Sequence, residues 1–354
     1  MKIVLRADSS IQMGTGHVMR CLTLAIELRE RGHNLTFVCR DLPGNLVALL
    51  EARGFPVQVL PAPDHSLALE DSPYARWLGV PWEVDAAQTQ AVIPAETDWL
   101  ILDHYGLDAR WERRLRSQVG QILVIDDLAN RSHDCDLLLD QNFYANQELR
   151  YQGLVPAHCR CLLGPQYTLL RSEFLAARQT LQSRAGELHR VLVAFGGSDP
   201  TNETAKVLAG IALLQGEMAV DVVVGQAHPE LTAIAQLCSE RSNWTYHCQI
   251  DYMAKLMVQA DLAIGAGGST SWERCCLGLP ALVAVTAENQ LELTADLATW
   301  GAIVNLGWAD RLTGEDYGQA IRSLTATQLS QMSQRGLVLV DGAGCSQVAA
   351  NISL

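Results

Sequence analysis

The chain has 354 residues, which at about 150 residues per domain predicts roughly two domains. Hydrophobic residues make up 49% and charged residues 18%, a balance that excludes an intrinsically disordered chain. The formal net charge is −13 and the lysines are Lys2, Lys206 and Lys255, which disfavours nucleic acid and anionic lipid as partners.

The N-terminal sequence MKIVLRAD lacks the apolar core of a signal peptide, and no stretch approaches 18 apolar residues. We therefore expect a cytoplasmic protein with no membrane partner. Five of the ten cysteines lie scattered in apolar stretches and are expected to be small hydrophobes: Cys21, Cys39, Cys135, Cys238 and Cys345. Neither Cys159 with Cys161 nor Cys275 with Cys276 has the CxxC spacing of a zinc site. No metal and no cofactor are predicted, and the sequence leaves the oligomeric state open.

In the first half of the chain, short apolar runs alternate with helical periodicity, which is typical of parallel strands covered by crossover helices. The expected strands are residues 3–5, 35–39, 57–60, 99–103, 122–126, 137–139 and 161–163. A helix between the first two, ending near Gly32, has an apolar face formed by Val18, Cys21, Leu22, Ala25 and Leu28.

The pattern restarts after a polar segment at residues 184–188. The expected strands are residues 191–195, 220–224, 245–248, 262–264 and 282–285. The expected helices are residues 202–214, 230–241, 253–259, 269–277 and 292–300. Two such series predict an α/β fold of two doubly wound Rossmann-like domains, residues 1–175 and 185–354, facing each other across a ligand-binding cleft.

Three glycine-rich turns each follow a predicted strand: GTGH at 14–17, FGGSDP at 195–200 and GAGGSTSWE at 265–273. A glycine turn at the carboxyl end of a parallel strand lets backbone N–H groups approach a phosphate. One such turn is more often a tight connection between a strand and a helix. Three of them favour phosphate binding.

Other nucleotide-binding and hydrolase motifs do not fit. The dinucleotide fingerprint GxGxxG fails because Met19 and Thr270 stand where a third glycine is needed. The phosphate-binding GK[ST] motif fails because Lys206 and Lys255 each follow alanine, and no GxSxG elbow is present. A nicotinamide oxidoreductase and an ATPase are therefore disfavoured.

The third turn carries a carboxylate as well as glycines. If a helix begins near Ser269, Glu273 projects from its first turn, where it could accept hydrogen bonds from both hydroxyls of a ribose whose diphosphate lies on the turn. The alternative is that Glu273 only complements the helix dipole. Asn289 and Gln290 offer amides for sugar hydroxyl or acetamido groups, although Asn289 could instead be a helix N-cap.

His17 follows Gly14, Thr15 and Gly16 at the start of the first helix, so it should emerge at the carboxyl end of the first strand as a general base for water. The alternative is a capping or surface histidine. Asp8 could share this site or form a turn.

Further polar residues end two other strands: Asp103, His104 and Tyr105 follow one, and Asp126 and Asp127 follow the next. By the strand-end rule these residues should lie near the same site, and Tyr105 is a candidate for substrate binding. Because neighbouring strand residues point to opposite faces, Asp126 and Asp127 do not form a glycosidase pair.

The ordered motifs RADSSIQMGTGHVMRCLTLA, LDHYGLD, VIDDLANR, FGGSDPTN and GAGGSTSWERCCLGLP with ENQ resemble the UDP-2,4-diacetamido-2,4,6-trideoxy-β-L-altropyranose hydrolases of pseudaminic acid biosynthesis. That family is similar to glycosyltransferases with two Rossmann domains. The resemblance implies metal-independent, inverting attack of water on the anomeric carbon, which releases UDP and 2,4-diacetamido-2,4,6-trideoxy-L-altrose.

The resemblance also implies residue roles. His17 matches the family's base. The uridine and diphosphate side matches Gly267, Gly268, Ser269, Thr270 and Glu273. Asn289 lies on the sugar side. Two rivals remain, a UDP-sugar glycosyltransferase of the same fold and a nucleotide-sugar binding protein without catalysis.

Overall fold

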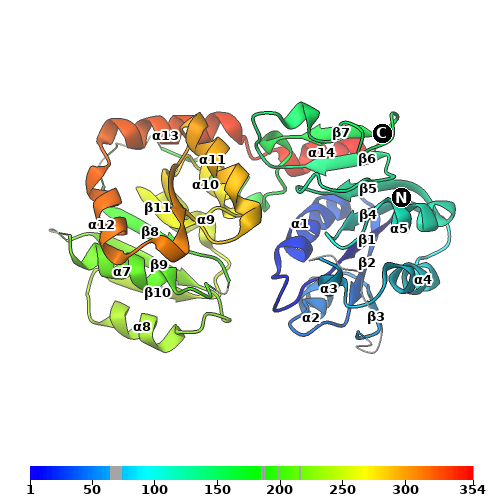
Figure 1. The fold of residues 1–354 in the computed structure, drawn as a ribbon, viewed down its shortest axis with the longest axis horizontal. Coiled ribbons are helices and arrows are strands. Elements are labelled where there is room, and N and C mark those ends of the chain that lie inside the picture. The colour runs from blue at the N-terminus through cyan, green and yellow to red at the C-terminus, as the bar shows by residue number, and fades with distance from the viewer. Residues whose placement is uncertain are drawn as a thin grey trace. The chain divides into compact units, whose positions relative to one another are not determined.

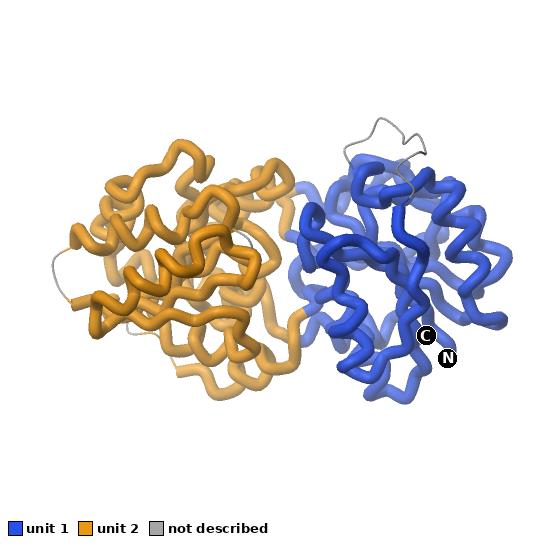
Figure 2. Tube along the Cα trace, turned by 90° about the horizontal axis from the view of Figure 1, so that it is seen from below, with its two compact units in different colours: residues 1–142, 146–169, 343–354 blue, residues 143–145, 170–342 orange. Residues whose placement is uncertain are grey.

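The computed structural model describes residues 1–63, 74–182, 184, 186, 188–197, 199–214 and 217–353. The chain divides into two compact units, each coloured separately in Figure 2. Unit 1 comprises residues 1–142, 146–169 and 343–354, and unit 2 comprises residues 143–145 and 170–342. Each unit is built around a parallel sheet with helices on its faces, the doubly wound α/β class that the sequence predicts (Figure 1).

Unit 1 contains a seven-stranded sheet of order β3-β2-β1-β4-β5-β6-β7, in which all neighbouring strands are parallel. The strands are β1 (Lys2–Ala7), β2 (Asn34–Arg40), β3 (Val57–Leu60), β4 (Thr97–Asp103), β5 (Val119–Ile125), β6 (Leu137–Asp140) and β7 (Arg160–Leu163). The chain order reverses beside β1, so the crevice at the carboxyl ends of β1 and β4 is the position where this topology places a ligand.

The helices of unit 1, apart from the C-terminal one, lie between these strands in the chain. They are α1 (Gly16–Glu30), α2 (Val47–Ala52), α3 (Ala75–Leu78), α4 (Trp82–Val92), α5 (Ala109–Leu115) and α14 (Gly344–Ile352), with 3₁₀ turns η1 (Arg116–Gln118), η2 (Gln147–Leu149) and η3 (Pro165–Tyr167). The expected first helix is confirmed, since α1 buries Val18, Cys21, Leu22, Ala25 and Leu28.

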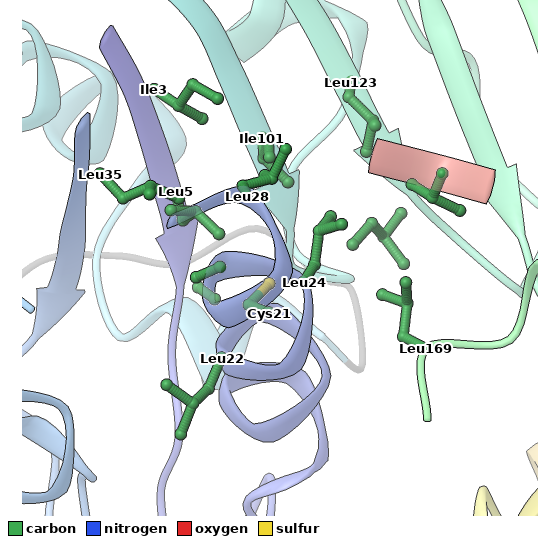
Figure 3. Close-up of a cluster of buried hydrophobic side chains, with 14 of the residues drawn as sticks. Ile3, Leu5, Cys21, Leu22, Leu24, Leu28, Leu35, Ile101, Leu123 and Leu169 are labelled. Carbon is green, nitrogen blue, oxygen red and sulfur yellow. The ribbon is translucent and has the colours of Figure 1, made fainter. Parts of the chain in front are cut away.

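The apolar face of α1 packs on the sheet in Figure 3, where Leu24 and Leu28 lie among Leu5, Ile101 and Leu123. Each such side chain contributes roughly 1.5–3 kcal/mol when it is withdrawn from water. This packing fixes the start of α1, and with it His17, relative to the ends of β1 and β4.

Unit 2 contains a six-stranded parallel sheet of order β10-β9-β8-β11-β12-β13. The strands are β8 (Arg190–Ala194), β9 (Ala219–Val224), β10 (Trp244–Cys248), β11 (Leu262–Ala266), β12 (Ala281–Val285) and β13 (Val304–Trp308). The order reverses between β8 and β11, which makes the carboxyl ends of these two strands the switch point of unit 2.

The helices of unit 2 cover both faces of its sheet. They are α6 (Ser172–Gln179), α7 (Glu203–Ala212), α8 (Leu231–Ser239), α9 (Met253–Gln259), α10 (Thr270–Cys276), α11 (Leu291–Trp300), α12 (Gly314–Ser323) and α13 (Ala326–Leu339), with 3₁₀ turns η4 (Glu288–Gln290) and η5 (Ala309–Arg311).

The predicted ranges need two corrections. The last helix, α14, belongs to unit 1, because Cys345, Val348 and Ile352 join the core cluster around α1, so the range 185–354 does not form one unit. Strand β13 was not predicted from the sequence. Its five residues include Asn305 and Gly307, which weaken the strand pattern, and its pairing with β12 shifts register.

Two further expectations concern cysteines and membranes. Cys21, Cys39, Cys135, Cys238 and Cys345 are free and buried, as small hydrophobes would be. None of the helices in the described parts of the chain has the length and apolar character that crossing a bilayer demands.

Candidate functional site

The GTGH turn lies between β1 and α1 in unit 1. Gly14 has φ +80°, a backbone conformation that glycine adopts readily, and α1 begins at Gly16. No atom lies within 4 Å of where a Cβ on Gly14 or Gly16 would sit, so both glycines border open space. The turn therefore delivers His17 to the carboxyl end of the sheet, as the sequence predicts.

His17 pairs with the last residue of β4. Its Nδ1 lies 2.6 Å from Oδ1 of Asp103, which is fully buried. Burial alone would raise the pKa of Asp103, but the charge of Arg20 and the hydrogen bonds from Arg20 and His17 hold that pKa well below its usual value. Because an ionised carboxylate can only accept, the neutral form of the ring carries its proton on Nδ1 and presents a lone pair on Nε2. No described residue hydrogen-bonds Nε2.

Arg20 joins two acidic residues at the strand ends. Its Nε and Nη2 donate to the two oxygens of Asp103 at 2.5 and 2.7 Å, and its Nη1 donates to Asp127 at 3.0 Å. The Tyr105 hydroxyl donates to the other oxygen of Asp127. Arg20 thus fixes the carboxylate that in turn fixes the His17 ring.

Aromatic rings surround the imidazole. The Tyr105 ring meets His17 edge to face with centroids 4.6 Å apart, and Trp77 of α3 lies 6.4 Å away. Trp77 also stacks on Tyr105 with centroids 5.8 Å apart. These contacts leave the His17 side chain 7% exposed, which limits the directions from which water can reach Nε2.

Asp8 lies in a buried network of ion pairs. Both of its oxygens accept from Arg6, at 2.6 and 2.8 Å, and one also accepts from the backbone N–H of Arg40 at 2.7 Å. Asp85 of α4 pairs with both arginines, at 2.6 Å to Arg6 and 2.7 Å to Arg40. Since Asp8 has no exposed surface, we assign it a structural role and no longer count it as a ligand-binding candidate.

The third glycine turn follows β11 in unit 2. A Cβ on Gly267 would collide with Oγ1 of the buried Thr294, so this residue has to be glycine, whereas Gly268 borders open space. Ser269 is exposed and Thr270 begins α10. No described residue accepts a hydrogen bond from the N–H of Gly268, Ser269 or Thr270. These three N–H groups can therefore bind an anion.

Glu273 lies in the first turn of α10, as predicted, with its side chain 20% exposed. Its Oε1 is 3.6 Å from Nη2 of Arg171, which also pairs with Glu173 at 2.8 Å. Burial raises the pKa of Glu273 to about 6, with Arg171 opposing and Glu173 adding to the shift. The carboxylate form, which can accept from hydroxyl groups, predominates above that pH.

Asn289 is exposed in η4, and the N-cap of α11 is Gln290, so the alternative of a helix N-cap at Asn289 is wrong. Oε1 of Gln290 accepts from the backbone N–H and the hydroxyl of Thr286 at 3.0 and 3.1 Å. Cβ of Gln290 lies 3.5 Å from where a Cβ on Gly267 would sit. The loop bearing Asn289 therefore borders the glycine turn.

The second glycine turn includes Ser198, which lies outside the described residues. Gly196 and Gly197 border open space. Asp199 is buried and accepts from the backbone N–H groups of Glu203 and Thr204 at 2.9 Å each. This carboxylate fixes the start of α7.

Sequence reasoning missed Arg20, Trp77, Arg171 and the pairing of His17 with Asp103. Arg20 carried a usable signal, because it follows His17 by three residues and so lies on the same face of α1. In the described residues, no group of three or more His, Cys, Asp or Glu side chains is placed to hold a metal ion.

Comparison with known sequences finds similar proteins at 26–28% identity. No protein-family model matches it. It is 26% identical to the spore coat polysaccharide biosynthesis protein SpsG of Bacillus subtilis, covering 99% of this chain and 97% of that protein. It is 28% identical to an uncharacterised protein of Methanocaldococcus jannaschii, over 84% of this chain but 58% of that longer protein.

A third relative is the UDP-2,4-diacetamido-2,4,6-trideoxy-beta-L-altropyranose hydrolase of Campylobacter jejuni. The chain is 26% identical to it over 76% of its own length and 86% of the relative's. The resemblance that the sequence motifs indicate is therefore confirmed: the chain is similar to a protein of that name.

Solved structures show the same fold. MurG of Acinetobacter baumannii matches with a TM-score of 0.68 at 15% identity, over 99% of both chains. UGT89C1 of Arabidopsis thaliana, complexed with UDP, matches with a TM-score of 0.69 at 12% identity, over 100% of both chains. The fold is that of the GT-B glycosyltransferases, with two Rossmann-like domains.

Proposed function

We propose that this protein hydrolyses a UDP-linked 2,4-diacetamido-2,4,6-trideoxy sugar at its anomeric carbon, with inversion, releasing UDP and 2,4-diacetamido-2,4,6-trideoxy-L-altrose. The observation that carries the proposal is the contact between His17 and Asp103, which orients Nε2 as a proton acceptor. The similarity to the Campylobacter jejuni hydrolase supports the choice of substrate.

His17 acts on water. Nε2 accepts a proton from the water, whose oxygen forms a bond to the anomeric carbon while the bond from that carbon to the diphosphate oxygen breaks. The bond electrons leave with UDP, and Asp103 stabilises the imidazolium that forms. UDP is a good leaving group, so the reaction requires one base and no strong general acid.

The nucleotide is assigned to unit 2. The N–H groups of Gly268, Ser269 and Thr270 bind the diphosphate, and the Glu273 carboxylate accepts from the ribose hydroxyls. Gly267 lets the turn pack against Thr294, and Asn289 contacts the sugar. In unit 1, Gly14 and Gly16 shape the turn that presents His17, and Tyr105 lines the space beside it.

A labelling experiment tests which bond breaks. The protein is incubated with the UDP-sugar in ¹⁸O-labelled water, without any acceptor and with a chelator present. We expect the label in the free sugar and none in UDP, because water attacks carbon and not phosphorus. Label in a phosphate product would indicate a pyrophosphatase, and activity lost to the chelator would indicate metal-assisted cleavage.

The glycosyltransferase alternative rests on the fold shared with MurG and UGT89C1. It predicts that UDP release stays at background until an acceptor is added. UDP binding without release under either condition would leave the non-catalytic alternative.

A further inference from the structure

Arg274 lies beneath the glycine turn of unit 2. The residue is 2% exposed, and its Nη2 donates to the backbone oxygen of Ala266 at 2.8 Å and to the hydroxyl of Ser271 at 2.9 Å. Ala266 is the last residue of β11, and Ser271 lies in the first turn of α10. One guanidinium therefore connects the two ends of the turn formed by residues 267–270.

The charge of Arg274 is only partly offset in the part of the chain that the structure describes, because Glu273 attracts it without forming an ion pair. No described residue forms an ion pair with it, and its buried Nε has no hydrogen-bond partner there. Burial lowers the pKa of Arg274 to about 10, so the guanidinium is still charged at neutral pH. The neighbouring carboxylate of Glu273 is paired with Arg171 instead. A buried charge without an ion-pair partner is costly, and proteins retain few of them.

The turn above this charge is prepared for an anion. The N–H groups of Gly268, Ser269 and Thr270 have no described acceptor, and no atom lies within 4 Å of where a Cβ on Gly268 would sit. The guanidinium does not fill this space. Its Nη1 lies 3.2 Å from where a Cβ on Gly265 would sit, on β11. The guanidinium therefore acts on a ligand at Gly268 through the turn and through its charge.

We propose that Arg274 is a positioning residue that holds the 267–270 turn open and supplies the positive charge that the diphosphate of a bound nucleotide neutralises. This inference rests on the proposed function, and it adds a residue and a physical reason for preferring a nucleoside diphosphate to the nucleoside. Arg274 is not a catalytic residue, because it contacts the turn and not the reacting atoms.

Arg178 supplies a matched control. It also belongs to unit 2, and it also donates to two backbone oxygens, those of Cys276 at 2.6 Å and Leu337 at 2.9 Å. Neither of these contacts touches the glycine turn. Arg178→Gln therefore reports what losing a backbone-bound arginine does to this unit in general.

Calorimetry on the full chain measures the affinities for UDP and for uridine, which lacks the phosphates. We expect Arg274→Gln to weaken UDP binding by about tenfold or more and to leave uridine binding within about twofold. Arg274→Lys keeps the charge and should stay within about threefold of the wild type for UDP. Arg178→Gln should change neither affinity.

Three outcomes would contradict one proposal or the other. Unchanged UDP affinity in Arg274→Gln, with the wild type binding UDP, would overturn the role of Arg274 and leave the proposed function standing. Equal losses for UDP and uridine would reduce Arg274 to a structural brace and overturn its electrostatic role. A wild type that binds neither UDP nor uridine would overturn the proposed function itself.

A second measurement needs no glutamine variant and covers the case in which Arg274→Gln fails to fold. Sodium pyrophosphate should raise the Tm of the wild type more than sodium chloride at the same ionic strength, because it binds the folded state and neutralises the buried charge. Equal shifts from the two salts would overturn the inference.

Discussion

The two units place opposite kinds of electrostatic environment at the two strands that flank the switch point, since β1 is the first strand of unit 1 and β11 takes in unit 2 the place that β4 has in unit 1. Each has a glycine turn at the carboxyl end of a central parallel strand, GTGH after β1 and GAGGST after β11. In unit 1 the described charges at this end are paired, with Arg6 bound to Asp8 and Asp85, and Arg20 bound to Asp103. In unit 2 the guanidinium of Arg274 lies beneath the turn without a described carboxylate partner.

Under the proposed function, this difference lets one fold serve two tasks. Paired charges hold side chains rigidly, which suits a histidine whose tautomer has to be fixed for proton transfer. An unpaired buried charge with free backbone N–H groups suits an anionic ligand that arrives from outside. Substitutions at four positions, two of them also followed as a function of pH, test the comparison from the largest expected effect to the smallest.

Replacing His17 removes the proposed base. We expect His17→Asn to lower kcat by roughly two to four orders of magnitude and to leave UDP affinity nearly intact, because nucleotide binding is assigned to the other unit. Steady-state kinetics and calorimetry measure the two quantities. His158→Asn, an exposed histidine of unit 1, is the matched control. Wild-type turnover in His17→Asn would remove the assignment.

Replacing Asp103 tests whether pairing matters in unit 1. In Asp103→Asn the side-chain amide still reaches Nδ1 of His17 but can donate a hydrogen bond to it. This favours the tautomer with the proton on Nε2, which cannot accept a proton from water, so we expect kcat to fall by roughly one to three orders of magnitude. Asp127→Asn is the comparison, since it removes the other carboxylate bound to Arg20 and leaves the His17 contact in place. Equal losses in the two variants would point to Arg20 and not to the tautomer.

Replacing Asp85 breaks the buried network of unit 1. Asp85→Asn leaves Arg6 and Arg40 short of one negative charge, so we expect a loss of about 3–5 kcal/mol in the free energy of unfolding, read as a lower Tm. Glu30→Gln, an exposed position on α1, should change stability by less than about 0.5 kcal/mol. A Tm equal to that of this control would contradict the prediction.

The network also predicts an acid sensitivity. Although burial opposes it, the charges of Arg6 and Arg40 hold the pKa of Asp85 below its unfolded value. The stability that ionised Asp85 contributes by pairing with Arg6 and Arg40 is therefore present above about pH 4, near the pKa of a free aspartate. It is lost as pH falls further. Asp85→Asn should show a smaller drop in Tm over that range than the wild type.

Glu273 provides the smallest test, on unit 2. Glu273→Ala should weaken UDP binding by about 1–3 kcal/mol, the range for a charged hydrogen bond lost from a partly buried site. Glu240→Ala, on the exposed end of α8, serves as the control. Unchanged UDP affinity in calorimetry would favour a role for Glu273 in complementing the helix dipole only.

The pH dependence of that binding has a definite sign. Burial raises the pKa of Glu273 to about 6, so the accepting carboxylate form is lost as pH falls through that value. UDP affinity should therefore rise between about pH 5 and pH 7. Because the terminal phosphate of UDP also titrates near pH 6, the readout is the difference between the wild type and Glu273→Gln. If UDP affinity changed with pH equally in the wild type and in Glu273→Gln, the Glu273 carboxylate would have no role in UDP binding.

The strands of both sheets could be predicted because each is a short apolar run bounded by turn residues. Every range expected as a strand lies in a strand of the structure, give or take the terminal residues. Residues 304–308 were not predicted as a strand because Asn305 and Gly307 interrupt the apolar run. The range 185–354 took in the C-terminal residues by chain order, whereas α14 joins the core around α1, and an amphipathic pattern does not specify which core a helix joins.

The candidate site was also predicted only in part. The glycine turns, His17 and Glu273 were placed at strand ends from the sequence, because strand-end position follows from chain order alone. Asp8 was grouped with them by the same rule, and the structure buries it against Arg6. Position along a strand does not reveal which face a neighbouring helix covers, so a buried ion pair and a ligand-facing carboxylate have the same sequence pattern.

The sequence by itself determined the parallel α/β class and the glycine turns, since periodicity and φ preferences act within a few residues. The tertiary structure decided which charges are paired. His17 meets Asp103 across 86 positions of sequence, and Arg6 meets Asp85 across 79. It also left Arg274 bound to Ala266 and Ser271 but without an ion pair to any described carboxylate. Electrostatic pairing depends on distance in space and on burial, and packing of the whole unit sets both.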